Sequence, residues 1–556
     1  MNERLQRYSW ILFACIAVLT LASTLVLEAR NFSPVPYLDM WDGYIGFDIR
    51  LSQGDLAAWI YLHNEHRIIF SRLLFWLDMH VFGGTTLFLI VCNYFLAGAA
   101  AATFASISRH ALPGPELRHA RWTLYAVLTT FCFSWVQAEN LSWGFQSQFF
   151  AAQLFPLLAV FLLWRSTQVN WCFPVACVVG FVSAGTMANG VLALPCLLLL
   201  ALILRAGSVR VVILAALSTV TLLSYFHGYH SNPEHGSISE TILTRPLDML
   251  RYVFLYLGNP IARLGAGARL GEAAGLFFCL SSLWLTWSTA QHWRERPIAL
   301  CLLAYIAYLG ATAFGTAGGR LVFGLEQALS GRYATPALMG WGALLILFAQ
   351  HWAKRFSQSA GLQIAALLLM LCFIKLQVHH LKKEVDEPRW KMLAALAIEM
   401  GVRDEATIPY VYNIFDRLAV YADDARQRNI SIFANPAIQD VHEKLGQKMP
   451  IQSTSTCQGT VDVVSAVKGD EKFRQVIGWI YSPEHNQVPN RLWITSADGT
   501  IIGYALTGYP RPDVAQVIDA RAKYAGFYGY VLKSTVPATI KLVADDPACA
   551  LVVQSQ

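Results

Sequence analysis

The chain has 556 residues, of which 55% are hydrophobic and only 14% are charged. This composition is typical of a polytopic membrane protein with a soluble appendage. The formal net charge of +6 is modest, and we interpret it as a signal of membrane topology rather than of nucleic-acid binding. The inner loops contain no P-loop and no dinucleotide-binding glycine pattern, which argues against ATP-driven transport and against a cytosolic nucleotide-sugar enzyme.

A bilayer core about 30 Å thick requires about 20 apolar residues for each crossing helix. Eleven apolar segments meet or approach this length, so we expect an α-helical protein with about 11 spans and a transmembrane domain over residues 1–377. The predicted spans cover residues 8–28, 84–107, 121–137, 148–165, 171–188, 190–205, 210–227, 270–290, 297–315, 334–351 and 360–377.

The basic residues predict the orientation of these spans. Arg4 and Arg7 precede the first span, and further arginines and lysines fall on alternate connections. The positive-inside rule therefore places the N-terminus in the cytoplasm, and eleven spans place the C-terminal segment outside. Cys457 and Cys549 bracket that segment, and a disulfide between them would agree with an oxidising compartment.

The stretch of residues 34–72, directly after the first span, is unusually polar. Asp39 and Asp42 lie three residues apart near the end of that span, and they are candidates for a general base, or for a base and its orienting partner. The alternative is that they are solvated loop acids or helix caps. Asp48 and Asp55 are predicted to have turn or cap roles.

The same stretch continues with two predicted juxtamembrane helices, over residues 55–62 and 67–82. Between them lie His63, Glu65 and His66, and Arg67 begins the second of these helices. On a helix, positions 63, 66 and 67 share a face, which favours a site that binds a phosphate or a metal or that orients the base. The alternative is a polar helix face without a ligand.

Two later outer segments carry further candidates for substrate binding. Glu139, Trp143 and Gln146 combine an aromatic ring with carboxylate and amide groups, a combination that suits sugar recognition. Tyr333, a further candidate for substrate binding, follows Arg332 in the sequence. Arg320 and Arg332 are arginines on the predicted outer side, against the positive-inside trend. They are candidates for phosphate binding, and interfacial snorkelling is the alternative.

The last third of the chain is predicted to be soluble. Residues 378–450 form a charged linker with amphipathic helices over 388–400 and 414–428, and residues 451–556 are expected to form a small all-β sandwich. The predicted strands cover residues 431–433, 460–467, 475–481, 491–495, 500–506, 529–532 and 539–543.

The C-terminal segment also resembles a recurrent β-module attached to bacterial cell-surface carbohydrate enzymes. The similarity lies in Gly478-Trp479, Gly503, Arg511-Pro512-Asp513-Val514 and Gly526-Phe527, and it covers about 90 residues. The resemblance implies either a structural lid or docking domain, or a domain that contacts glycan directly.

The plan of residues 1–377 resembles the GT-C class of glycosyltransferases, with a long first span, an acidic first outer loop and many further spans. The resemblance implies transfer of a sugar from a polyprenyl-phosphate carrier, with an acid of the first outer loop, here Asp39 or Asp42, as the catalytic base. The chain is similar in plan to the enzymes that glucosylate bacterial O-antigen. It lacks the adjacent Asp-Glu pair of protein mannosyltransferases, which leaves the subfamily and acceptor open.

The sequence thus predicts a membrane glycosyltransferase of the bacterial inner membrane, with a lipid-phosphate sugar as donor and a glycan, lipid or protein as acceptor. An O-antigen polymerase or ligase and a non-catalytic transporter of lipid-linked sugars are the alternatives. No cofactor is predicted. A divalent metal stays open without a ligand pattern that supports it, and the partners include membrane lipids but no nucleic acid.

Overall fold

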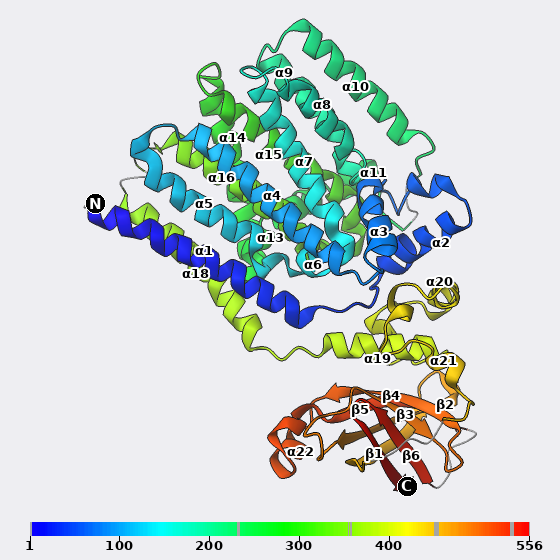
Figure 1. Ribbon diagram of the computed structural model, residues 1–556. Helices are drawn as coiled ribbons and strands as arrows, with labels where there is room; N and C mark the ends of the chain where they lie inside the picture. The colour runs from blue at the N-terminus through cyan, green and yellow to red at the C-terminus, as the bar shows by residue number, and fades with distance from the viewer. Residues whose placement is uncertain are drawn as a thin grey trace. The chain divides into compact units, whose positions relative to one another are not determined.

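The computed structural model describes residues 3–230, 234–353, 355, 359–449, 455–533 and 539–554 (Figure 1). The chain forms two compact units. Unit 1 comprises Met1–Arg30, Ala57–Phe75 and Leu87–Glu384, and unit 2 comprises Asn31–Leu56, Trp76–Thr86 and Val385–Gln556. The polar stretch after the first span is therefore divided, since its first half belongs to unit 2 and its second half to unit 1.

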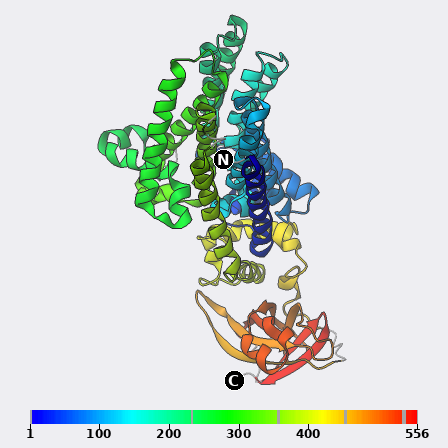
Figure 2. The same cartoon turned by 90° about the vertical axis from the view of Figure 1, so that its left-hand side faces the viewer.

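Unit 1 is a bundle whose long helices pack side by side (Figures 1 and 2). Within the described residues, eight helices are long and apolar enough to cross a membrane. They are α1 (Glu3–Asn31), α4 (Leu87–Ala111), α7 (Ser147–Arg165), α10 (Ser208–Phe226), α14 (Ala268–Ala290), α15 (Pro297–Arg320), α16 (Ala334–His351) and α18 (Ala360–Lys382). The chain is thus a multi-pass helical membrane protein.

The other three predicted spans form shorter helices. They are α5 (Arg118–Phe133), α8 (Cys172–Ser183) and α9 (Ala193–Ile203). The apolar runs are long enough in sequence, but the helices end early. The α8 helix stops before the turn at Gly185, and a 3₁₀ segment over Ala188–Leu192 precedes α9.

Several short helices complete unit 1. The helix α12 (Pro246–Leu257) is too short to cross a membrane, and it packs against α14 and α15. The short helices are α3 (Ile69–Val81, shared with unit 2), α6 (Ala138–Ser142), α11 (Ile238–Thr244), α12 (Pro246–Leu257) and α13 (Asn259–Ile261).

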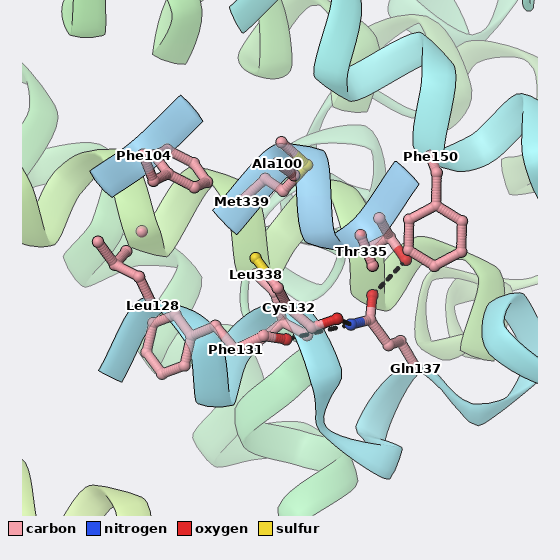
Figure 3. Close-up of a pocket in the computed structure, with 12 residues that line it drawn as sticks. Ala100, Phe104, Leu128, Phe131, Cys132, Gln137, Phe150, Thr335, Leu338 and Met339 are labelled. Atoms are coloured by element: carbon pink, nitrogen blue, oxygen red, sulfur yellow. Dashed lines mark hydrogen bonds between the residues drawn. The ribbon is translucent and has the colours of Figure 1, made fainter. Parts of the chain in front are cut away.

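The interior of unit 1 contains a small apolar cavity (Figure 3). Phe104, Leu128 and Met339 are among its lining residues, and its free volume of about 10 Å³ is enough for no more than about one water molecule. At its edge the Gln137 amide donates to the carbonyls of Phe131 and Cys132. This cavity is too small for a ligand, and we treat it as a packing feature.

Unit 2 combines the first half of the polar stretch with the C-terminal third of the chain. Its helical parts are a π-helical turn (Trp41–Ile45), α2 (Gly46–Ser52), α19 (Glu387–Met400), α20 (Phe415–Gln427), α21 (Val441–Lys444) and α22 (Pro512–Val517). The amphipathic helices predicted over 388–400 and 414–428 are confirmed as α19 and α20. The π-helical turn Trp41–Ile45 packs on α20.

The strands of unit 2 form one seven-stranded antiparallel sheet in the order β1-β2-β5-β4-β3-β6-β7. The strands are β1 (Gln458–Val467), β2 (Asp470–Tyr481), β3 (Arg491–Thr495), β4 (Ile501–Tyr509), β5 (Gly526–Leu532), β6 (Thr539–Asp545) and β7 (Ala548–Gln554). Six of the seven predicted strands are confirmed. The exception is residues 431–433, which form a 3₁₀ turn in which Ser431 has a φ of 54°.

The sheet is a half-barrel rather than a sandwich of two sheets. The edge strand β7 is hydrogen-bonded to the segment that precedes the other edge strand, β1. Cys457 N–H donates to the Ala550 carbonyl, and Ala550 N–H donates to the Ser455 carbonyl. Cys457 and Cys549 form the predicted disulfide at this seam, with 5.4 Å between their Cα atoms. A single curled sheet can enclose its own core, so no second sheet is required.

Candidate functional site

The first candidate cluster, in unit 1, begins with a tight turn over His63–His66. The backbone N–H of each of these two histidines donates to the carbonyl of the other at 2.9 Å, and Asn64 adopts the left-handed region with a φ of 51°. The prediction that His63, His66 and Arg67 share one face of a helix is therefore wrong. The turn still brings the same residues together, because it folds them back on one another.

Arg67 has a role in holding this turn. Its guanidinium donates to the backbone carbonyls of Ile60, Tyr225 and His227 at 2.5, 3.0 and 2.7 Å, and it lies over the Tyr225 ring. Arg72, which the sequence reasoning did not single out, is buried and similarly donates to two loop carbonyls. Arg67 thus ties the turn to the end of α10, where carbonyls lack helical partners, and Arg72 holds the loop just before the turn.

Glu65 is paired with a histidine from a distant segment. Nδ1 of His235, whose side chain is almost fully buried, lies 2.6 Å from Oε1 of Glu65. The Tyr225 hydroxyl donates to the Glu65 carbonyl at 3.0 Å. The pair therefore joins the turn to the connection between α10 and α11.

His66 is a half-buried residue at the centre of the cluster. Its Nδ1 lies 3.3 Å from the Ala188 backbone N–H, which donates to it. Burial, the Arg320 charge and the neighbouring histidines His63 and His235 lower the pKa of His66 from 6.5 to about 3. The imidazole is therefore neutral at physiological pH and presents a polar group without adding charge.

Arg320 ends α15 and lies within electrostatic range of His66, Tyr252 and Tyr333. Its guanidinium lies 5.9 Å from the centre of the Phe323 ring. In the part of the chain that the structure describes, Arg320 has no hydrogen bond and no ion pair with a carboxylate. A half-buried arginine without an acidic partner is a natural ligand for an anion.

Arg332 lies in the same region but has a partial partner. Its Nε is 3.3 Å from Oε1 of Glu139, and each side chain of this pair is about 30% exposed. Both Arg320 and Arg332 act electrostatically on the buried Tyr333. The predicted binding residues Arg320, Arg332, Tyr333 and Glu139 are thus linked in one neighbourhood, and Arg320 connects this neighbourhood to His66.

A buried hydrogen-bond network connects the segments that carry Glu139 and Arg332. The Thr335 hydroxyl donates to the Gln137 amide oxygen at 2.6 Å and accepts from the Asn140 amide at 2.7 Å (the bond to Gln137 is drawn in Figure 3). Asn140 also donates to the Arg332 carbonyl. This network holds α6, which carries Glu139, against the turn that carries Arg332, although the sequence reasoning did not use Gln137 or Thr335.

Trp143 and Gln146 belong to the packed interior instead. Both are buried, and the Trp143 ring packs against Phe145 with 5.9 Å between centroids. The Trp143 carbonyl accepts from the buried Asn93 amide. The aromatic residues beside Tyr333 are Tyr252 and Tyr256 of α12. The sequence did not indicate either of these tyrosines.

The predicted acids of the first loop lie in unit 2. Asp42 accepts a hydrogen bond of 2.7 Å from the Tyr412 hydroxyl, and its other oxygen lies 2.7 Å from the Arg417 guanidinium. Tyr421 also interacts with this carboxylate. Asp39 is half-buried and stands one helical turn earlier, just after Leu38, whose N–H donates to the Val411 carbonyl.

Two other carboxylates of unit 2 are more deeply buried. Asp48, predicted as a turn or cap residue, instead forms a buried ion pair with Arg428 and lies 3.7 Å from His80. Asp78, which the sequence reasoning missed, accepts from the Tyr44 hydroxyl at 2.6 Å. Burial raises the Asp78 pKa from 3.8 to about 6. Asp78 lies within an apolar helical run, so only its three-dimensional partners reveal it.

One further buried acid lies in a spanning helix of unit 1. Glu28 of α1 is 8% exposed, and its carboxyl group interacts with the Tyr94 and Ser142 hydroxyls. Ser142 belongs to α6, the same helix as Glu139. Burial of a carboxyl group within a membrane span costs free energy, so such groups usually have a functional role. An acidic residue inside an apolar run is visible in the sequence, and it is the signal by which Glu28 could have been found.

Within the described residues, no three His, Cys, Asp or Glu side chains gather as a metal-binding group. No protein-family model, no curated protein and no solved structure matches the chain.

Proposed function

We propose that the chain is a membrane glycosyltransferase that moves a monosaccharide from a polyprenyl-phosphate carrier to an acceptor hydroxyl at the outer face of the bacterial inner membrane. In this proposal the enzyme is of the GT-C type, and it modifies a cell-surface glycan such as the O-antigen of lipopolysaccharide. Asp39 or Asp42 acts as the base.

The observation that carries the proposal is Arg320, a cation without an acidic partner among the described residues, at the end of a spanning helix. Its neighbours are a neutral histidine and two tyrosines, which are hydrogen-bonding groups without negative charge at physiological pH. Transfer of the sugar leaves charge on the carrier phosphate, and an arginine in a partly dry site stabilises such charge. Arg332 would add a second cation from the same neighbourhood.

The second requirement of the reaction is removal of the proton from the acceptor hydroxyl. The proposal assigns this step to the first-loop acids. Asp42 keeps its carboxylate between a phenol and a guanidinium, so its position is well defined, whereas Asp39 is half-buried and lies within one turn of it. The Asp42 contacts are those of a base held in a fixed place.

The proposed orientation has a cytoplasmic N-terminus and a C-terminal domain outside. The Cys457–Cys549 disulfide supports it, since disulfides persist mainly in oxidising compartments. The distribution of arginines supports the cytoplasmic N-terminus. An outer C-terminal domain also requires an odd number of crossings, so the proposal counts the shorter helices α5, α8 and α9 as crossings in addition to the eight long ones.

Glu28 favours one alternative, a non-catalytic transporter of lipid-linked sugars, because transporters place ionisable groups inside their spans. The experiment must therefore separate chemistry from movement. Full-length protein in proteoliposomes is supplied with a polyprenyl-phosphate monosaccharide labelled in the sugar, and release of free polyprenyl phosphate is measured with and without glycan acceptors.

The proposal expects acceptor-dependent consumption of the monosaccharide donor. Consumption of only a pyrophosphate-linked oligosaccharide would instead support a polymerase or ligase. Movement of the intact labelled lipid between leaflets, without bond cleavage, would support the transporter and overturn the proposal.

A further inference from the structure

Unit 2 contains a pocket to which no part of the proposed reaction assigns a role. It lies between the start of α19 and the strands β2, β4 and β5, and its free volume is about 140 Å³. Its lining includes the charged side chains of Asp386 and Arg511 and the aromatic side chains of Trp390, Tyr509 and Tyr528. Its volume compares with about 10 Å³ for the apolar cavity of unit 1, so this pocket has room for a ligand.

Three aromatic rings form the wall of the pocket. Trp390 lies 5.2 Å from Tyr528 and 5.6 Å from Tyr509, and the two tyrosines are 4.5 Å apart. The Trp390–Tyr528 pair is edge-to-face, so the rings brace one another without covering each other's faces completely. The Tyr509 hydroxyl donates to the Arg389 carbonyl at 3.1 Å, which fixes the innermost ring.

Two donors on this wall are available. Trp390 and Tyr528 are half-buried, and neither the indole N–H nor the Tyr528 hydroxyl forms a hydrogen bond to any described residue. Aromatic side chains with one apolar face and one polar tip usually have a partner when they are enclosed. Their ring faces and free donors thus present apolar and polar contacts side by side.

The charged groups of the pocket already form ion pairs. Arg511 donates to both oxygens of Asp513 and to Asp462, at 2.5 to 3.2 Å. Asp386 lies 2.6 Å from the Arg389 guanidinium. These pairs contain three carboxylates and two guanidinium groups, so an anionic ligand gains nothing from the net charge, while the remaining lone pairs and N–H groups can bind hydroxyls.

We propose that this pocket binds one ring of a neutral saccharide. The apolar C–H face of a pyranose would stack on Trp390 or Tyr528, and its hydroxyls would bind Asp386, Arg511 and the two free aromatic donors. A neutral polyol with an apolar face matches this combination of stacking faces and paired charges, whereas a phosphate or a carboxylate does not. The site does not rest on the proposed transferase activity.

The test uses the full-length protein in a detergent without a sugar headgroup. Saturation-transfer NMR and calorimetry are carried out with neutral gluco-, galacto- and manno-configured trisaccharides, and inorganic phosphate and a galacturonic acid trisaccharide serve as anionic probes. At least one neutral trisaccharide should bind saturably, with the strongest transfer to its C–H protons. Tighter binding of the anionic probes, or no saturable binding of any neutral trisaccharide, would overturn the proposal.

Two conservative variants locate the site. Y528F removes one hydroxyl and should weaken binding about threefold to tenfold, the effect of one hydrogen bond. W390F keeps an aromatic ring but removes the indole N–H and part of the stacking face, and it should weaken binding at least as much. The matched control is Y524F, since Tyr524 is a partly exposed tyrosine of the same unit that does not line the pocket.

Thermal unfolding of each variant shows whether the fold is retained. Unchanged saccharide affinity in both correctly folded pocket variants would overturn the assignment. The variants D39N and D42N should bind the saccharide normally even where they lose sugar transfer, so failure of the transferase proposal and failure of this one give different results.

Discussion

The Tyr412 hydroxyl donates a 2.7 Å hydrogen bond to Asp42, a residue 370 positions earlier in the chain. Arg417 holds the other oxygen of the same carboxylate at 2.7 Å. The acid that the first loop supplies is therefore positioned by the C-terminal third of the chain, within one compact unit. Truncation of the soluble tail would consequently remove the partners of the proposed base, not only an appendage.

The variants D39N and D42N test which acid acts as the base. Asn keeps the shape and one acceptor of Asp, so substitution of the base should lower sugar transfer by about 10²- to 10⁴-fold while the protein stays folded. Transfer from the labelled polyprenyl-phosphate sugar is the measurement, and D416N, at a highly exposed acid of α20, is the control. Full activity in both variants would show that neither acid is the base.

The variant Y412F separates the two acids further. It removes a hydrogen bond that Asp42 accepts, so it should lower the rate and move the pH profile of transfer if Asp42 is the base. If Asp39 is the base, Y412F should leave the pH profile unchanged. The melting temperature provides the control for folding in both cases.

Asp48 should behave differently, because its carboxylate has a structural partner. It is buried and paired with Arg428, which also contacts Asp424 at 3.3 Å. The substitution D48N leaves this arginine with one weaker partner, and we expect a loss of about 1–3 kcal/mol of stability. Thermal unfolding should show a lower melting temperature for D48N than for D416N. An unchanged melting temperature would contradict a stabilising role for the pair.

Local patterns predicted much of this fold, and long-range partners account for what they missed. The strand β3 has the predicted bounds of Arg491–Thr495, and α19 differs by one residue, because alternation and amphipathic spacing are properties of a few neighbouring residues. The helical interpretation of His63–Arg67 failed because Asn64 adopts a left-handed conformation, which residue spacing does not reveal.

The candidate site shows the same limit. Arg67 and Arg320 look alike in sequence as outer arginines, yet one is held by three backbone carbonyls and the other has no partner among the described residues. Only the folded chain distinguishes them. Likewise, the partners of Asp42 come from a segment more than 360 residues away, and no motif within the loop indicates them.

Arg320 and Arg67 therefore provide a matched pair of variants. Under the proposed function, removal of Arg320 takes away the cation assigned to the donor phosphate, and R320Q should reduce sugar transfer by about 10²-fold or more with the melting temperature unchanged. R67Q should instead lower the melting temperature, because three carbonyls lose their donor. The control is R245Q, since Arg245 is exposed and paired with Asp248. Normal transfer by R320Q would remove the main support for the phosphate site.

The lowered pKa of His66 makes the stability of unit 1 depend on pH. The folded-state pKa is lowered from 6.5 to about 3 by burial and by Arg320, His63 and His235, so between these values the unfolded chain binds more protons than the folded one. Stability contributed by the neutral imidazole is complete above pH 6.5 and is lost as the pH falls towards 3. The melting temperature of the wild-type protein in detergent should therefore fall between pH 7.5 and 5. In H66N, which keeps an acceptor for the Ala188 N–H but does not titrate, this fall should be smaller. H230N, at an exposed histidine, should retain the wild-type dependence, and equal falls in all three proteins would show that His66 does not remain neutral in the folded state.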